Sequence, residues 1–527
     1  MVISGVFFLI ISLFLFWVWG YIAWNWSILP LGAFLRDDLF DFFFEDISIV
    51  SLVMLFFCGS IALFYCYHYF GGGVEGSLLY PLMVWFLGVM AVLVISGNVL
   101  FSLVLWEYLG LVSFFLILFY SNMSSLRASL ITLFASRFGD AALFFLVMSL
   151  SWWLDFSCVS IIFLLLLVVL SKSACYPFIS WLLEAMRAPT PVSSLVHSST
   201  LVAAGVWFFF RYSGVFEENI LCFLFLISLV TILISGGCAL FFNDLKKLVA
   251  LSTCNNVSWC LVFFVCGDLD LALLQLITHG VCKCYLFMSI GDLMSLSGGS
   301  QSSVGVYLSR YGGLLGVYLQ GFLVLSLCGL PFLGVFFSKH GLFSEIIYIF
   351  GWGFLFLMLL GFFLSYSYSF RLVLLLLKGM GGLSAGYSSS FLMIALISFL
   401  GSLINVCGSG MMSEVSGLAN VWSFVMLLIQ LLGCGFGWLV FIFMGLGSPI
   451  SWSTLLYSDS IVKGIYGSYL SISKVCWSSF FRWELYLFSV LPSLGSSFMI
   501  FRSSLFSFNV LIFSVSLVMF LFFFLGG

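Results

Sequence analysis

The chain has 527 residues, of which 63% are hydrophobic and only 7% are charged, and its formal net charge is −3. Soluble globular domains carry about 25% charged residues, so this composition excludes a soluble protein, and we expect no nucleic-acid partner. Apolar runs long enough to cross a bilayer, about 20 residues each, recur from end to end. The sequence therefore predicts an all-α polytopic membrane protein.

The start of the chain and its cysteines narrow the class further. The first residues, MVISGVFFLIISLFLFWVWG, lack a basic leader and a small-residue cleavage site, which predicts a membrane helix rather than a signal peptide. The fifteen cysteines are scattered and form no C-x-x-C pair. We therefore expect them to act as small apolar residues, with no iron–sulfur or zinc site in this chain.

Fifteen spanning segments are predicted in chain order, two of them broken. They are residues 4–24, 47–67, 80–96, 98–120, 126–150, 158–186 (broken), 193–212, 219–241, 245–266, 271–296, 314–348 (broken), 351–376, 389–407, 420–446 and 505–525. Between the last two, residues 448–504 intersperse charged residues with apolar and aromatic ones. This pattern favours an interfacial amphipathic helix, ended or kinked by Pro492, over a disordered tether.

Lysine and arginine concentrate on one predicted side of the membrane, which gives an orientation. With the N-terminus on side A, ten of them fall in side A loops, against only Arg36 and Arg211 on side B. Side B instead collects acidic residues: Asp37, Asp38, Asp41, Glu45, Asp46, Glu217, Glu218, Asp268 and Asp270. We therefore expect side A to be the cytoplasm or matrix, with the N-terminus there and the C-terminus on the opposite side.

A weak internal repeat divides the core. Five helices in residues 80–212 precede five in 219–378, and the fourth of each set is broken, near Lys172 to Pro177 and near Cys328 to Pro331. An odd number of helices inverts the second unit, and inverted repeats with matching broken helices indicate a transport path at the bilayer midplane. The predicted divisions are N-terminal helices in 1–79, the two repeats, further core helices in 379–447, the amphipathic helix in 448–504 and an anchor helix in 505–527.

Nine charged or titratable residues fall inside the predicted spans: Glu107, Arg137, Asp140, Lys172, His197, His279, Lys283, Lys339 and Arg371. A charge at the bilayer centre costs roughly 2.5–3.5 kcal/mol, so these groups need partners or water. We expect Glu107 to form a titratable pair with Lys172, or else to be neutral through burial. Lys172 and Lys339 adjoin the breaks, where a lysine can exchange a proton or act as a fixed cation on freed carbonyls. Arg137 and Asp140 are spaced to pair, in a structural or a conducting role.

Histidines and further lysines extend this row. His279 and Lys283 lie four residues apart and share a helix face. Together with His197 they suit a proton relay, although a lone buried histidine is often structural. Lys246, beside Lys247 at a helix start, is expected to be partly interfacial, as a proton entrance or only a topology signal.

Six stretches around these residues resemble the antiporter-like subunits of respiratory complex I. They are WEYLGLVSFFLI, SRFGD, LSKSACYPFISWLLEAMRAPTPVSSLVHSSTLVAAG, NDLKKLVALST, THGVCKCYLFM and LCGLPFLGVFFSKH, spread over residues 97–378. The resemblance implies a proton path with these members: Glu107 and Lys172 as a gating pair, Asp140 nearby, His197, His279 and Lys283 as a central hydrated axis, and Lys339 toward the exit.

The resemblance also implies a location and partners. Electron transfer through NADH, FMN, iron–sulfur clusters and ubiquinone elsewhere in the complex would drive the protons, and this chain would hold no cofactor. Residues 448–504 would lie laterally along the matrix face against the chain 4 and chain 2 paralogues, in an inner mitochondrial membrane that can supply cardiolipin. The front of the chain departs from the family by one missing helix.

Two other functions stay open at this point. One is a subunit of a multi-subunit cation/proton antiporter, which shares the same core. The other is a membrane scaffold that transports nothing. The C-terminal extension favours the complex I subunit over the antiporter, and the intramembrane charges disfavour the scaffold.

Overall fold

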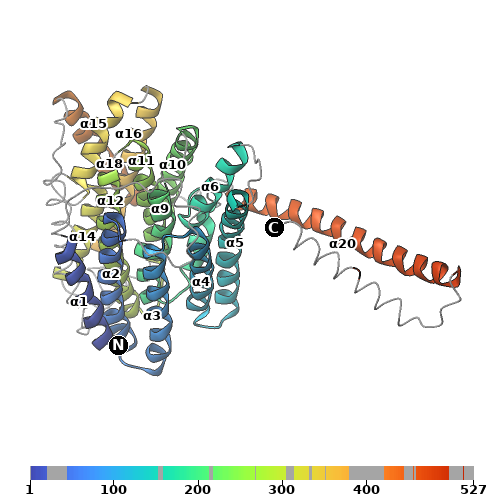
Figure 1. Ribbon diagram of the computed structural model, residues 1–527. Helices are drawn as coiled ribbons and strands as arrows, with labels where there is room; N and C mark the ends of the chain where they lie inside the picture. The colour runs from blue at the N-terminus through green and yellow to red at the C-terminus, as the bar shows by residue number, and fades with distance from the viewer. Residues whose placement is uncertain are drawn as a thin grey trace. The chain divides into compact units, whose positions relative to one another are not determined.

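The structure is a computed structural model that describes residues 2–19, 44–151, 158–212, 218–267, 269–303, 314–330, 335–349, 352–378, 420–443, 455, 458–497 and 514. The chain forms two compact units, Met1–Asp459 and Ser460–Gly527. The first unit is built from helices (Figure 1), and the β pairing of the described residues is one bridge between Asp244 and Ser302.

The helices of the first unit follow the predicted apolar runs closely. They are α1 (Val2–Trp19), α2 (Asp46–Phe70), α3 (Val74–Ile95), α4 (Val99–Leu118), α5 (Met123–Ser151), α6 (Cys158–Lys172), α7 (Ile179–Ala185), α8 (Thr190–Leu195), α9 (Leu201–Arg211), α10 (Glu218–Ala239), α11 (Leu245–Val265), α12 (Leu269–Leu296), α14 (Leu314–Cys328), α15 (Phe336–Ile349), α16 (Trp352–Lys378) and α18 (Asn420–Phe443).

Ten helices in the described ranges are long and apolar enough to cross a membrane. This confirms an all-helical multi-pass chain. The predicted spans 389–407 and 505–525 lie outside the described residues, except residue 514. The total of fifteen spans and the inverted repeat therefore stay predictions.

Both predicted helix breaks are present. In the first, α6 ends at Lys172 and α7 begins at Ile179, and the indole N–H of Trp181 donates to the Ser171 carbonyl at 3.0 Å. In the second, α14 ends at Cys328, and Gly329 has a φ of +81°. Such breaks survive at membrane depth only where protein or water satisfies the freed backbone.

One irregularity was not predicted. A π-helical turn, Val196–Thr200, joins α8 to α9, and the Thr200 hydroxyl donates to the Leu195 carbonyl at 2.8 Å. The element from Thr190 to Arg211 is completely buried. Single π turns inside helices are frequent at functional sites, and this one carries His197.

The second unit is dominated by one long helix, α20 (Ser458–Ser497), of 40 residues. Its aromatic side chains are exposed, Trp477 at 78% and Phe480 at 74% among them. The helix continues past Pro492 to Ser497. The prediction that Pro492 ends the helix is therefore wrong. The helix within 448–504 is thus as predicted for the described residues, whereas its lateral placement is untested.

Close packing supports the first break, and this gives a test. A Cβ at Gly205 of α9 would lie 2.8 Å from the Ser173 nitrogen and 3.1 Å from the Val169 carbonyl oxygen, both backbone atoms beside the break. Gly205→Ala should therefore destabilise the protein by about 1–3 kcal/mol through overpacking. The measurement is the thermal unfolding midpoint of the purified protein in detergent.

Gly88 of α3 is the matched control, because a Cβ there meets no atom within 4 Å. Gly88→Ala should be neutral or stabilise by about 0.4–1 kcal/mol through the unfolded chain. Equal effects of the two substitutions would contradict the close approach of α9 to the break.

Candidate functional site

A row of buried titratable side chains runs through the first unit. The predicted members that are less than a tenth exposed are Asp140 on α5, Lys172 on α6, His197 on the π turn, Lys246 on α11, His279 and Lys283 on α12, and Lys339 on α15. Glu107 on α4 is different, because its side chain is 35% exposed. The structure thus places these groups inside the protein, as the cost of a charge in lipid requires.

Lys172 pairs with Asp140, not with Glu107 as predicted. The Lys172 Nζ lies 3.4 Å from Asp140 Oδ1, and the Lys172 ammonium also lies 5.3 Å from the centre of the Trp106 ring. Glu107 instead forms an ion pair with Arg137. The prediction of a Glu107–Lys172 pair is therefore wrong in this structure.

The geometry of α4 explains the exchange. A Cβ at Gly110 would lie 3.8 Å from Lys172 Nζ and 3.9 Å from Asp140 Oδ2, so the buried pair packs against Gly110. Glu107, one turn earlier, reaches the half-exposed Arg137 instead. Arg137 Nη1 is also 3.8 Å from Asp140 Oδ2, and the predicted i, i+3 pair is thus present. Asp140 therefore sits between two cations.

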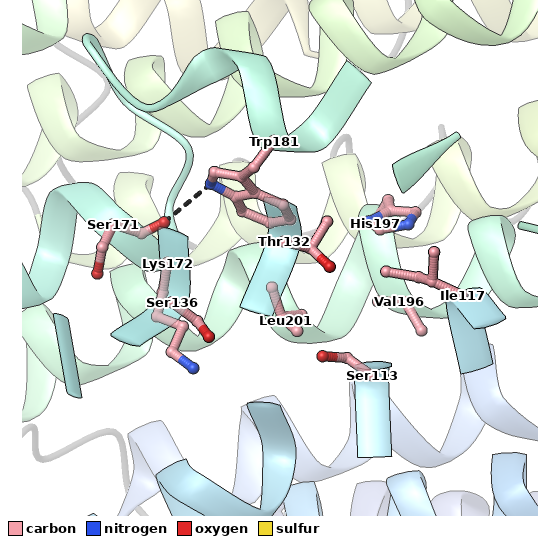
Figure 2. A pocket seen from close by; sticks show the side chains of 10 residues that line it. All are labelled: Ser113, Ile117, Thr132, Ser136, Ser171, Lys172, Trp181, Val196, His197 and Leu201. Atoms are coloured by element: carbon pink, nitrogen blue, oxygen red, sulfur yellow. Dashed lines mark hydrogen bonds between the residues drawn. The ribbon is translucent and has the colours of Figure 1, made fainter. Parts of the chain in front are cut away.

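A small cavity, lined by apolar and polar side chains, lies between Lys172 and His197. Figure 2 shows the Lys172 amine and the His197 ring on either side of Thr132. Ser113, Ser136 and Trp181 also line it. The volume open to the centre of a water molecule is about 10 Å³, which is room for roughly one water. A water there can bridge polar groups that do not touch directly.

His197 and Lys246 both meet the junction between α7 and α8. The centre of the His197 ring lies 6.3 Å from that of Trp181 on α7, and neither of its nitrogens has a hydrogen-bond partner among the described residues. The Lys246 Nζ donates to the Ala188 carbonyl at 3.1 Å. Two members of the row therefore meet at the junction of α7 and α8.

Lys246 is buried, which corrects the expectation that it is partly interfacial. It is 4% exposed, whereas the side chain of its neighbour Lys247 is 38% exposed and pairs with Asp244 at 3.1 Å. Successive helix residues point about 100° apart, so one lysine faces the α7–α8 junction and the other faces outward. Sequence adjacency could not distinguish them.

A second small cavity joins Lys283 to the second break. Ser252, Asn256, Lys283, Cys328 and Tyr368 are among the residues that line it. Lys283 donates to the Ser252 hydroxyl. His279, one turn earlier on α12, is fully buried, and its ring nitrogens have no hydrogen-bond partner among the described residues.

Lys339 contacts Cys328, one of the residues that line this cavity. Its Nζ donates to the Cys328 carbonyl at 2.7 Å and to the Ser365 hydroxyl at 3.2 Å. It also lies 5.3 Å from the centre of the Tyr366 ring. Lys339 thus satisfies the last carbonyl of α14, which is the contact that the fixed-cation alternative predicts.

Two buried arginines stabilise helix ends and are not members of the row of titratable side chains. Arg211, predicted in a side B loop, is instead buried, and its Nη1 donates to the Val94 carbonyl at 2.7 Å. Arg371 donates to the carbonyls of Ala239, the last residue of α10, and of Phe242 just beyond it, at 2.8 and 3.0 Å. Arginine holds its proton at any accessible pH, so both are fixed charges on helix ends.

Known proteins resemble this chain across the region that holds the row. The family model described as "NADH:quinone oxidoreductase/Mrp antiporter, TM" matches residues 96–367. NADH-ubiquinone oxidoreductase chain 5 of Aedes aegypti is 33% identical over 337 residues, covering 60% of this chain and 56% of that protein. Chain 5 of Caenorhabditis elegans is 35% identical over 333 residues, covering 60% and 62%. The matches thus span little more than half the length of these two relatives.

Two solved structures share the fold. A chain of the Mrp complex from Dietzia sp. DQ12-45-1b aligns with a TM-score of 0.68 at 21% identity, covering 92% of this chain and 59% of that one. A chain of an archaeal membrane-bound sulfane sulfur reductase aligns with a TM-score of 0.64 at 16% identity, covering 83% and 93%. At these identities the likeness concerns the fold alone.

Proposed function

Because the chain belongs to the NADH:quinone oxidoreductase/Mrp antiporter transmembrane family, we propose that it translocates protons as an antiporter-like membrane subunit of an NADH:quinone oxidoreductase complex. Within that complex it would be the counterpart of chain 5. The observation that carries this proposal is the buried row from Asp140 and Lys172 to Lys339, with two small cavities beside its members.

The two cations around Asp140 suggest how the row works. Lys172 holds Asp140 at 3.4 Å, and Arg137 stands at 3.8 Å as a second partner. When Lys172 gives its proton to a water in the cavity toward His197, Arg137 continues to balance Asp140. When Lys172 regains a proton, the ion pair closes again. The exchange moves one proton without leaving a buried carboxylate unpaired, which would be costly.

The remaining members continue the path. From His197 the α7–α8 junction leads to Lys246, and the second cavity links Lys283 with the Lys339 region. Histidine and neutral lysine both accept and release protons, whereas arginine does not. NADH, FMN, iron–sulfur clusters and ubiquinone would act in partner subunits, and their redox energy would reach this row through the complex.

The location follows from the same proposal. The chain would lie in the mitochondrial inner membrane with its N-terminus in the matrix and its C-terminus in the intermembrane space. Two basic residues support this orientation, because basic residues favour the matrix side. Arg187 lies in the junction between α7 and α8, and Lys247 lies at the start of α11. The α20 helix would lie against the chain 4 and chain 2 paralogues, because its exposed aromatic side chains need a partner surface or lipid, cardiolipin included.

The test uses the intact complex reconstituted in liposomes. The complex should contain flavin and iron–sulfur subunits, oxidise NADH with quinone, and take up protons. Lys172→Met should lower the number of protons taken up per NADH oxidised while the complex still assembles. Unchanged uptake would remove Lys172 from the path. A preparation without redox subunits that exchanges cations for protons would instead support the antiporter alternative.

A further inference from the structure

A polar cluster outside this row joins α2 to the end of α12. The His68 Nε2 lies 3.6 Å from Asp292 Oδ1, and the His68 side chain is 29% exposed while that of Asp292 is 12% exposed. Tyr65, one turn before His68, is fully buried, and its hydroxyl lies against Gly291, the neighbour of Asp292. The cluster therefore leads from a partly exposed imidazole to a buried hydroxyl.

Gly291 brings the two hydroxyls of this cluster together. A Cβ at Gly291 would collide with the Tyr65 hydroxyl and would lie 2.9 Å from Thr190 Oγ1. Both oxygens thus face the same point on α12, next to Asp292. Helices α2, α8 and α12 pack on one another here, although they are distant in sequence.

The cluster ends beside the row. Thr190 begins α8, two residues after Ala188, whose carbonyl binds Lys246 at 3.1 Å. His197 lies on the π turn that directly follows α8, and the centre of its ring lies 6.3 Å from that of Trp181 on α7. The backbone N–H of Leu245 donates to the Gln301 carbonyl at 3.1 Å, which places the start of α11 beside the segment that follows α12. His68 and Lys246 therefore belong to the same end of the bundle.

We propose that His68 and Asp292 form a port that takes protons from the solvent at this end and passes them through Tyr65 and Thr190 to Lys246 and His197. This inference rests on the proposed function. His68 binds a proton from water, and Asp292 stabilises the resulting imidazolium. The Tyr65 and Thr190 hydroxyls each donate a proton toward Lys246 and accept one from the His68 side. Every residue is thereby restored after one transfer.

The experiment compares five variants of the reconstituted complex with the wild type. The share of proton uptake that belongs to this chain is the difference between wild type and Lys172→Met. Asp292→Asn and Tyr65→Phe keep the side-chain shape but remove the acid or the hydroxyl. Each should cut that share roughly tenfold or more, because a positioned proton-transfer group contributes at least that much. Tyr67→Phe is the control, since Tyr67 is 51% exposed on the same turn.

His68→Ala tests the port against a structural role. It should lose the same share, and imidazole in the medium at that end should restore it, because a soluble base can replace a missing surface proton acceptor. Wild-type rates for Asp292→Asn and Tyr65→Phe would overturn the port while leaving the function intact. A loss in His68→Ala that imidazole fails to restore would also overturn it. No difference between Lys172→Met and wild type would overturn the proposed function itself.

Discussion

Asp140→Asn should remove the proton uptake that depends on this chain and should also destabilise it. The substitution leaves the Lys172 ammonium, which is 1% exposed, without its counter-charge. Removing one partner of a buried ion pair costs about 3–5 kcal/mol. We expect a lower unfolding midpoint and, at a temperature where the complex still assembles, fewer protons taken up per NADH oxidised. Both are measured on the same purified complex.

Two other carboxylates serve as references for this prediction. Glu107→Gln removes the partner of Arg137 but leaves the Lys172–Asp140 pair in place, so its effect should be smaller than that of Asp140→Asn. Glu184→Gln breaks a partly exposed pair with Arg187 and should change stability by less than about 1 kcal/mol. If Glu107→Gln proved more damaging than Asp140→Asn, Lys172 would depend on Glu107, as the sequence predicted, and the pairing in this structure would not be the working one.

The wrong prediction of a Glu107–Lys172 pair shows which features of the site a sequence can predict and which it cannot. Hydropathy predicts that Asp140, Lys172 and Glu107 lie inside the membrane, and the resemblance to antiporter-like subunits implies that they lie near one another. Which of them touch depends on the rotation of α4 and on the missing side chain at Gly110, where the pair packs. A one-dimensional pattern carries no such rotation, so it names the members of a cluster better than its contacts.

The helix breaks could be predicted from the sequence, whereas the π turn could not. Proline and glycine in the sequence predict the breaks after Lys172 and Cys328, because both residue types disfavour a continuing helix. The turn at Val196–Thr200 has no such marker, since Val-His-Ser-Ser-Thr can also form an ordinary helix. It is held by the Thr200 hydroxyl on the Leu195 carbonyl and by complete burial. The burial of Lys246 likewise depends on the α7–α8 junction, which is far from it in sequence.

The buried cations separate into two kinds by what they bind. Arg211 and Arg371 donate to helix carbonyls and never release a proton, so they stabilise helix ends. Lys172 and Lys283 face a carboxylate or a hydroxyl beside small cavities and can change charge. Lys339 shares both features, because it caps α14 yet borders the second cavity through Cys328. Its role therefore has to be decided by substitution.

Lys339→Arg and Lys339→Met together decide it. Arginine can keep a donor on the Cys328 carbonyl but cannot release its proton, so the complex should assemble normally and lose the proton uptake due to this chain. Methionine removes the donor as well and leaves a buried carbonyl unsatisfied, at a cost of about 1–3 kcal/mol in stability. The unfolding midpoint should thus fall for Met and hold for Arg, whereas uptake should fall for both. Normal uptake in the Arg variant would make Lys339 a fixed helix cap, and the path would then have to leave the second cavity from Lys283.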